Sequence, residues 1–215
     1  MTDKKEKDID FSKRAASYDG GVMGKASQRF YNLLIREVEL PPGAAVLDVG
    51  CGTGTILKRI ADKTDITGYG TDIAENMIAE AKKKCPQMSF AIASCDKLPF
   101  GDQVFDAVTA CLAYHHFNNK EGFAEVAVRV LKPGGVLYIA DPRFPWLVRK
   151  TLNGFFRFFR VAGAFYNAKE IEARFAEYGF TGAGNAVHGY AQVVKLWKGG
   201  QDEMFRLIYS QGWHL

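Results

Sequence analysis

A glycine-rich segment between a predicted strand and a predicted helix is the part of the sequence best suited to hold a ligand. Residues 48–54 read Asp-Val-Gly-Cys-Gly-Thr-Gly. Glycines at such a junction let the backbone turn sharply and approach a bound molecule closely. Glycine pairs of this kind occur in many tight turns, but the strand before them and the helix after them make this segment a candidate ligand-binding loop.

The glycine spacing and two acidic residues restrict the ligand. The dinucleotide fingerprint G-x-G-x-x-G would need a third glycine at position 55, which is Thr55, whereas the third glycine here is Gly54. The carboxylate of Asp48 would repel a pyrophosphate but suits an ammonium group. Asp72, at the end of the next predicted strand, is placed to accept hydrogen bonds from both ribose hydroxyls. These features indicate S-adenosylmethionine, which has a ribose and positive charge but no phosphate; the alternative is a tight turn with Asp72 as a helix cap.

The elements that must position this loop alternate between strands and helices. Short apolar runs predict strands, and apolar residues at helical spacing predict helices. Predicted strands cover residues 44–49, 66–71, 88–93, 105–110 and 136–140, and predicted helices cover residues 11–39, 53–63, 74–84 and 120–131. Such alternation predicts βαβ units in a parallel sheet. Further helices are expected near residues 143–160 and 168–178, followed by an antiparallel strand pair within residues 181–198.

The motifs resemble those of the class I S-adenosylmethionine-dependent methyltransferases. Residues 46–54 resemble the first motif of that family, and further stretches follow in the family's order at residues 70–77, 98–100, 105–108 and 131–135. The segment at residues 11–19 is similar to the start of the ubiquinone/menaquinone-biosynthesis-type branch, whose members methylate small molecules. The resemblance implies an α/β fold: a Rossmann-like, seven-stranded, mostly parallel sheet with helices on both faces and its last strand antiparallel.

We expect one methyltransferase domain over residues 1–215. Its parts would be an N-terminal helical cap (1–40), a cofactor-binding core (44–142), a lid-like insertion (143–165), and a C-terminal helix with an antiparallel strand pair (166–215).

The resemblance also implies roles for individual residues around S-adenosylmethionine. Asp48 and the loop backbone would face the methionine moiety, with Asp48 at its amino end, and Asp72 would hold the ribose. Ile73 and Met77 would lie against the adenine, while Tyr18 would close over the cofactor. The implied cofactor-binding residues are Tyr18, Asp48, Gly50, Cys51, Gly52, Asp72, Ile73, Met77, Ser94, Cys95, Asp96 and Cys111.

One position departs from the family pattern. Where many relatives have an aspartate for the adenine amino group, this chain has Ser94, and Asp96 stands two positions later. Either Ser94 does a weaker version of the same task, or the loop shifts and Asp96 substitutes. The backbone N–H of Cys95 can serve the ring in both cases.

Residues Tyr114, His115 and His116 are the candidates for chemistry beyond the cofactor. Methyl transfer is an in-line displacement, in which the protein aligns the acceptor, excludes water and, for some acceptors, removes a proton. A histidine at the carboxyl edge of the sheet could be that base, and Tyr114 could face the acceptor. The alternative is that the histidine pair packs at the sheet edge and positions the loop.

The four cysteines, Cys51, Cys85, Cys95 and Cys111, contain no C-x-x-C pair. This spacing predicts reduced thiols and no metal site. Three of them fall in cofactor-loop positions, which suggests a thiol–metalloid acceptor as one hypothesis. Packing of small residues is the simpler explanation.

Composition limits the class of protein and its partners. The chain is 47% hydrophobic and 24% charged, a composition that fits one soluble globular domain. Its net charge of +4 is too small to argue for binding to nucleic acid. No apolar segment follows the charged start, and no window has the about 18 apolar residues that a membrane span needs. We therefore expect a cytoplasmic protein with neither a signal peptide nor a transmembrane segment.

Residues 143–160 combine many aromatic residues with basic ones and contain no acid. One interpretation is a cover for a small-molecule or lipid-like acceptor, which could also rest peripherally on a membrane surface. The other is an ordinary core helix with a solvated basic edge. The acceptor and the oligomeric state are open at this point.

The predicted function is S-adenosylmethionine-dependent methyl transfer to such an acceptor. The alternatives are a non-catalytic, regulatory module that binds the same cofactor, and an RNA methyltransferase. The latter is disfavoured because residues 110–113 read Ala-Cys-Leu-Ala, where an N-P-P-Y-type tetrapeptide would be expected.

Overall fold

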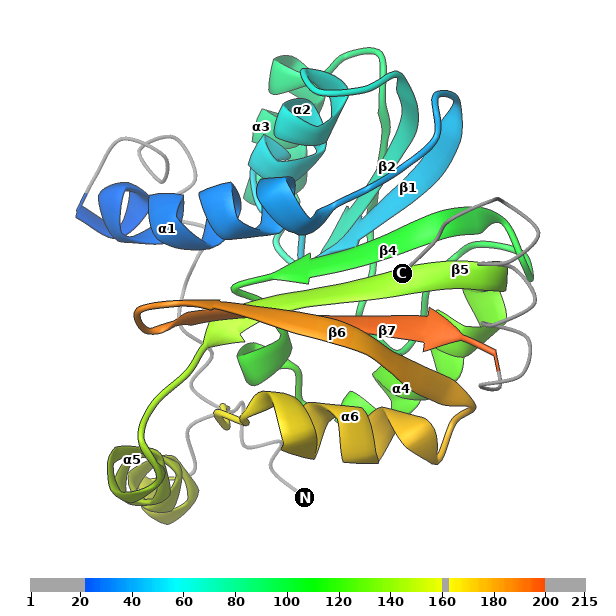
Figure 1. The fold of residues 1–215 in the computed structure, drawn as a ribbon. Coiled ribbons are helices and arrows are strands. Elements are labelled where there is room, and N and C mark those ends of the chain that lie inside the picture. The colour runs from blue at the N-terminus through cyan, green and yellow to red at the C-terminus, as the bar shows by residue number, and fades with distance from the viewer. Residues whose placement is uncertain (1–21, 160–162, 200–215) are drawn as a thin grey trace, which may run out of the picture.

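A computed structural model describes residues 22–159 and 163–199 of the chain, with helices and strands in an alternating order (Figure 1). The strands are β1 (Ala44–Val49), β2 (Ile66–Asp72), β3 (Ser89–Ile92), β4 (Phe105–Cys111), β5 (Leu131–Pro142), β6 (Phe180–His188) and β7 (Ala191–Lys198). The helices are α1 (Val22–Glu37), α2 (Thr55–Ala61), α3 (Glu75–Lys84), α4 (Lys120–Val130), α5 (Trp146–Phe159) and α6 (Ala168–Ala176), with a short 3₁₀ helix, η2 (Tyr114–His116).

All seven strands form a single sheet in the order β3-β2-β1-β4-β5-β7-β6. β1 pairs in parallel with β2 and with β4, and the pairs β2–β3 and β4–β5 are parallel as well. β7 runs antiparallel to both of its neighbours, β5 and β6. The predicted seven-stranded, mostly parallel sheet with an antiparallel last strand is confirmed.

Helices cover both faces of this sheet (Figure 1). α1, α2 and α3 pack on one face, where the predicted apolar stripe of α1 is buried together with Val46 of β1. α4 and α6 pack on the other face, where Phe123 and Phe175 surround Leu47 of β1. Neighbouring residues of β1 therefore point into two different cores, and this is why the strand is an unbroken apolar run.

At two of the predicted boundaries that differ from the structure, glycines explain the difference. β5 begins at Leu131 rather than 136, because Leu131 pairs with Phe105 and the ladder then shifts register before Val136 pairs with Ala107. Gly134, with φ of 77°, lets the strand pass through the segment predicted to be a turn. The helix predicted from residue 53 begins as α2 at Thr55, since the preceding glycine is left-handed.

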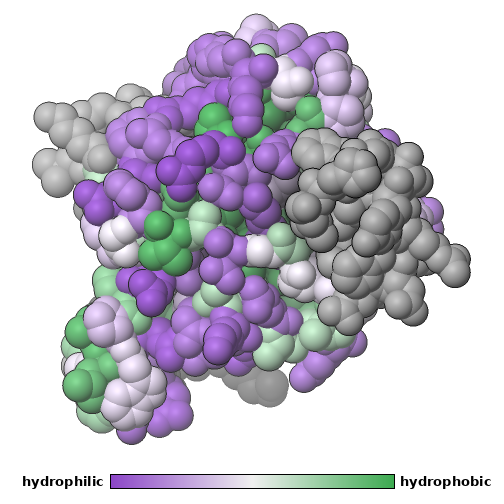
Figure 2. Space-filling view, in the orientation of Figure 1, coloured by the Kyte–Doolittle hydropathy of each residue, from purple (hydrophilic) through white to green (hydrophobic). Residues whose placement is uncertain are grey.

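α5 is the element farthest from this three-layer arrangement of helices, sheet and helices (Figure 1). It lies at one end of the molecule, below the sheet edge and apart from the helices that cover the faces (Figure 1). In Figure 2 its outer side shows a group of hydrophobic side chains. Across the described part of the chain, none of the helices has the length and apolar character needed to cross a membrane.

Candidate functional site

The candidate site lies where the carboxyl ends of β1, β2 and β4 meet. The sheet order reverses at β1, whose neighbours are β2 on one side and β4 on the other, and ligands of α/β sheets bind in the crevice at such a point. A cavity of about 230 Å³ opens there. Its wall includes every predicted cofactor residue of the described ranges: Asp48, Gly50, Cys51, Gly52, Asp72, Ile73, Met77, Ser94, Cys95, Asp96 and Cys111. Tyr18 lies outside the described residues.

The glycine loop needs its glycines for two different reasons. Gly50 has φ of 73° and donates its N–H to Thr71 O at 2.8 Å. A Cβ added at Gly50 would stand 2.6 Å from the Ala113 Cβ, so the loop packs directly on the segment after β4. Gly52 has φ of 50°, and an added Cβ would meet no atom within 4 Å. The missing side chain at Gly52 therefore leaves open space in the cavity.

Asp72 fastens this loop to the end of β2. Its Oδ2 accepts a hydrogen bond from Gly52 N at 2.9 Å, and its Oδ1 accepts one from Ala74 N at 2.9 Å. Burial raises the pKa of Asp72, although these backbone donors oppose the shift. Each carboxylate oxygen has a second lone pair, so Asp72 can still accept hydrogen bonds from ligand hydroxyls.

Asp48 is a buried carboxyl group in the same cavity wall. Its Oδ1 accepts a hydrogen bond from Thr109 Oγ1 at 2.6 Å. Burial raises the pKa of Asp48 to about 7, and the neighbouring Asp72 charge adds to the increase while the Thr109 hydrogen bond opposes it. A cationic group of a ligand would stabilise the ionised form of Asp48.

The charge of the cavity wall argues against a phosphate ligand. Within the described residues, the wall contains the carboxyl groups of Asp48, Asp72 and Asp96 but no lysine or arginine. Lys84 lies behind the loop, where its Nζ donates to Thr53 Oγ1 at 2.7 Å, and it is not part of the wall. A ligand with hydroxyls and a positive charge fits these carboxyl groups, and a pyrophosphate does not.

Ser94 and Asp96, the two alternatives for the adenine edge, form one cluster. The Ser94 hydroxyl donates to Asp96 Oδ1, and Asn119 Nδ2 donates to Asp96 Oδ2 at 2.9 Å. These hydrogen bonds lower the pKa of Asp96 below its ordinary value. Nearby, Ile73 is 67% exposed at the cavity wall, so a flat ligand would cover an otherwise solvated apolar side chain.

The structure separates the three candidates for chemistry. Tyr114 is buried among Phe123, Phe175 and other rings of the core, and burial raises the pKa of its hydroxyl. Neither Tyr114 nor His115 belongs to the cavity wall, whereas His116 does. Side chains of consecutive residues in one 3₁₀ turn point in different directions, which is why only one of the three reaches the cavity. The burial of Tyr114 outside the cavity wall does not support its expected acceptor-facing role.

His115 positions this turn. Its backbone N donates to Asp141 Oδ2 at 2.8 Å, and its ring Nδ1 lies 2.9 Å from Asp141 Oδ1. The ring of Phe165 stacks on the imidazole with centroids 5.1 Å apart, and His115 O accepts from Ala164 N at 2.9 Å. Asp141 was not among the predicted residues, although an acid at the end of the fifth strand is a signal of the kind that singled out Asp72.

His116 presents a neutral imidazole to the cavity. Burial, together with smaller effects of the neighbouring His115 and Lys120, lowers its pKa to about 3. A base with so low a pKa is poorly matched to proton removal near pH 7. His116 is therefore better suited to hydrogen bonding with a ligand than to general-base catalysis.

The cysteines of the wall are protonated thiols. Burial raises the pKa of Cys51 and of Cys111 well above the ordinary value and that of Cys95 to about 11. Thiolate is the form that binds metals and metalloids, so this environment favours packing as the role of these residues.

Other residues of the cavity wall were not predicted from the sequence. Tyr31 of α1 reaches the cavity from the opposite side, and Leu112 adopts a left-handed φ of 54° where the chain leaves β4. Asn119, the cap of α4, also belongs to the wall. Tyr31 follows Phe30, which belongs to the buried apolar stripe of α1. Helical spacing alone does not distinguish a ring that faces the cavity from a ring in the core.

Comparison with known proteins agrees with this geometry. Residues 47–139 match the family of methyltransferase domains. The chain has its glycine loop and most of its cavity wall within this matched segment. It is 34% identical over 116 residues to a demethylmenaquinone methyltransferase of Beutenbergia cavernae, a match that covers 54% of this chain and 48% of that protein.

A second relative is the 2-methyl-6-phytyl-1,4-hydroquinone methyltransferase of Synechocystis. It is 37% identical over 105 residues, with 47% of this chain and 33% of that protein covered. The chain spans about half the length of the curated relatives it matches first. Among solved structures, a chain in the complex between the Haloferax volcanii Trm112 methyltransferase activator and a methyltransferase superposes with a TM-score of 0.77 at 19% identity, covering 89% of this chain and 98% of that chain. The last similarity concerns the fold alone.

Proposed function

We propose that this protein transfers a methyl group from S-adenosylmethionine to a small, apolar acceptor with a quinone or hydroquinone ring. The observation that carries the proposal is the set of polar groups in the cavity wall. It combines the buried carboxyl groups of Asp48 and Asp72 with open space at Gly52. No lysine or arginine of the described ranges contributes to it.

When bound, S-adenosylmethionine supplies a methyl group on a positively charged sulfur, which is already activated for displacement. Asp48 in its ionised form would bind the α-ammonium group, and Asp72 would accept hydrogen bonds from the ribose hydroxyls. Ile73 and Met77 would cover the faces of the adenine. The Ser94–Asp96 pair and the backbone N–H of Cys95 would then recognise its edge.

The acceptor would bind beside His116, Leu112 and Tyr31, on the part of the wall that the cofactor residues leave open. The neutral imidazole of His116 would orient a ring hydroxyl or carbonyl by hydrogen bonding. Apolar neighbours would exclude water from the methyl path. This assignment needs no strong base, which agrees with the lowered pKa of His116.

The quinone class rests on the relatives. By their names, they act on demethylmenaquinone and on a phytyl hydroquinone, and we extend to this chain only what these acceptors share, an aromatic ring with an apolar chain. A location in the cytoplasm stays a prediction.

Incubation with S-adenosylmethionine and a panel of prenylated naphthoquinols and benzoquinols tests the proposal. We expect S-adenosylhomocysteine to accumulate and one methyl group to appear on an acceptor in the mass spectrum. The control is Asp72→Asn, which should lose turnover because it replaces one of the two oxygens that accept from Gly52 N and Ala74 N and also weakens ribose binding. Calorimetric binding of S-adenosylhomocysteine without turnover of any panel member would contradict the proposed acceptor class and favour a cofactor-binding module.

A further inference from the structure

The outer face of α5 carries large apolar side chains in solvent. Leu147 is 69% exposed and Phe158 is 80% exposed, and Trp146 at the start of the helix is 60% exposed. Leu147 and Phe158 are separated by about three helical turns and therefore lie on the same side, together with the half-exposed Phe155. Figure 2 shows hydrophobic surface at the end of the molecule where α5 lies in Figure 1. We call this surface the α5 outer face.

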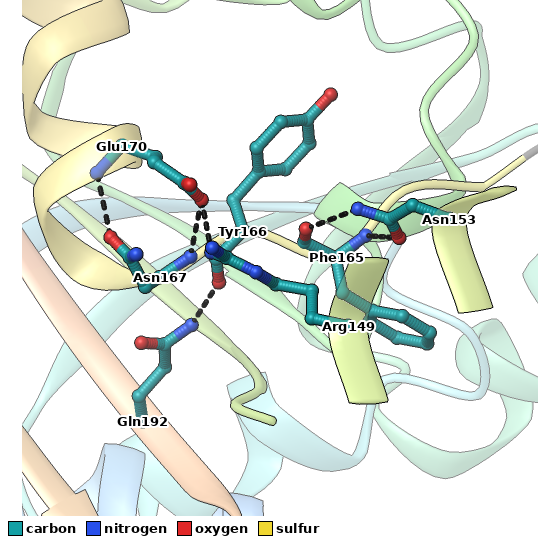
Figure 3. Close-up of polar contacts among 7 residues, drawn as sticks. All are labelled: Arg149, Asn153, Phe165, Tyr166, Asn167, Glu170 and Gln192. Atoms are coloured by element: carbon teal, nitrogen blue, oxygen red, sulfur yellow. Dashed lines mark hydrogen bonds and ion pairs between the residues drawn. The ribbon is translucent and has the colours of Figure 1, made fainter. Parts of the chain in front are cut away.

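Polar contacts on the opposite side hold α5 in this orientation (Figure 3). The buried Arg149 pairs with Glu170 of α6. Asn153 makes two hydrogen bonds of 2.9 Å with the backbone of Phe165, one through Nδ2 and one through Oδ1.

The partner segment is itself anchored, because Glu170 and Asn167 form the capping box of α6. Gln192 Nε2 of β7 donates to Tyr166 O at 2.6 Å. The inner side of α5 is thus tied to the sheet, and the apolar outer face is directed away from the protein by specific contacts.

The charged side chains of α5 and of the segment before it have one sign. Arg143, Lys150 and Arg157 are exposed, and residues 143–159 contain no acidic side chain. The Nζ of Lys150 lies 5.0 Å from the centre of the Trp146 ring. An apolar face with tryptophan, leucine and phenylalanine beside basic residues is the pattern of a helix that lies in a membrane interface.

We propose that the α5 outer face binds the surface of a membrane that contains anionic lipids. With 14 residues, α5 is too short to span a bilayer but can lie along its surface. Leu147 and Phe158 would enter the headgroup–acyl boundary while Lys150 and Arg157 contact lipid phosphates.

The α5 outer face is also connected to the rim of the cavity. Phe156 on the inner side of α5 contacts Phe165, with ring centroids 5.7 Å apart, and Phe165 stacks on His115. The rings of His115 and His116 have centroids 3.9 Å apart, and His116 lines the cavity. Docking through α5 would bring this rim close to lipid, where an apolar acceptor dissolves. The docking itself does not depend on methyl transfer.

Vesicle co-sedimentation of the full chain, without cofactor or acceptor, tests the proposal. We expect binding to phosphatidylcholine vesicles that contain phosphatidylglycerol, weaker binding to phosphatidylcholine alone, and release by salt. Leu147→Ser with Phe158→Ser should reduce the partition coefficient at least about tenfold. Lys150→Glu with Arg157→Glu should reduce it at least about thirtyfold on the anionic vesicles.

Matched controls replace similarly exposed residues elsewhere. Val187→Ser on β6 and Lys82→Glu on α3 should leave vesicle binding unchanged. Three results would each overturn the proposal. The first is no binding of the folded chain to anionic vesicles, and the second is an equal loss of vesicle binding in the control variants. A third is a dimer, seen in sedimentation velocity, that Leu147→Ser with Phe158→Ser dissociates while vesicle binding is absent. Calorimetry with S-adenosylhomocysteine reports on the cavity separately, so failure of membrane docking and failure of the proposed function can be told apart.

Discussion

Asp48→Asn is the substitution that separates the energetic cost of the buried carboxyl group from its role in binding. Asparagine keeps the shape of the side chain and can still accept the hydrogen bond from Thr109 Oγ1. It removes the titration, in which burial raises the pKa of Asp48 from 3.8 to about 7.

The sign of the stability effect follows from this increase in pKa. A group whose pKa is higher in the folded than in the unfolded state favours folding at low pH, and this contribution is lost as the pH rises from about 4 through 7. For Asp48 the difference corresponds to at most about 4 kcal/mol of unfolding free energy. Without ligand, Asp48→Asn should therefore be more stable than the wild type at pH 8, by up to this amount, and should lack this part of the pH dependence.

Binding should respond in the opposite direction. Between pH 5.5 and 7.0 the ionised fraction of Asp48 rises from about 3% to about 50%, so affinity for a ligand ammonium group should increase about fifteenfold. The ammonium of S-adenosylhomocysteine stays largely charged in this range. Asp48→Asn should bind it about ten- to a hundredfold more weakly at pH 7, with little pH dependence, because a hydrogen bond between charged groups is lost.

Urea unfolding and calorimetric titration with S-adenosylhomocysteine, each at several pH values, measure both effects. An Asp48→Asn variant with the wild-type pH dependence of stability would refute the buried-carboxyl argument. Unchanged affinity at pH 7 would refute the contact between Asp48 and the ammonium group.

Three further predictions concern the loop, the turn and the imidazole. Gly52→Ala should cost about 1 kcal/mol of stability in thermal unfolding, because alanine is strained at a left-handed φ. It should also reduce S-adenosylhomocysteine affinity in calorimetry at least about tenfold, because its methyl group enters the cavity. The control Gly43→Ala is also left-handed with no atom nearby, so it should cost the same stability and leave the affinity intact. Asp141→Ala should lower the unfolding free energy by about 2–4 kcal/mol in urea, since it leaves two donors of His115 unsatisfied, and a loss below about 1 kcal/mol would contradict this. His116→Asn should retain the wild-type pH profile of turnover between pH 5.5 and 8, because burial holds the pKa of His116 near 3; disappearance of a step in that profile would identify His116 as the base instead.

Much of the sheet and of the cavity wall could be predicted because strand ends obey simple geometry. In a parallel sheet, the residues that end successive strands meet at one edge. Asp48 and Asp72 are each read from the sequence as acids at such ends, and the structure brings them to one cavity. The glycines between them mark where the backbone must be left-handed or leave space.

The proposed acceptor side could not be predicted to the same depth, because it depends on side-chain direction within short, irregular segments. Tyr114 and His116 are two residues apart, yet one is in the core and the other in the cavity wall. Tyr31 arrives from a helix remote in sequence. The position of α5 depends on Arg149 and Asn153, whose partners in residues 163–170 have no pattern that pairs them in advance.

The central claim is that the cavity holds a cationic nucleoside without phosphates. Parallel calorimetric titrations of the wild-type chain with S-adenosylhomocysteine and with NAD⁺ at pH 7 test it most directly. We predict saturable binding of S-adenosylhomocysteine at one site per chain and no measurable binding of NAD⁺. Binding of NAD⁺ that equals or exceeds that of S-adenosylhomocysteine, or no heat with S-adenosylhomocysteine, would contradict it.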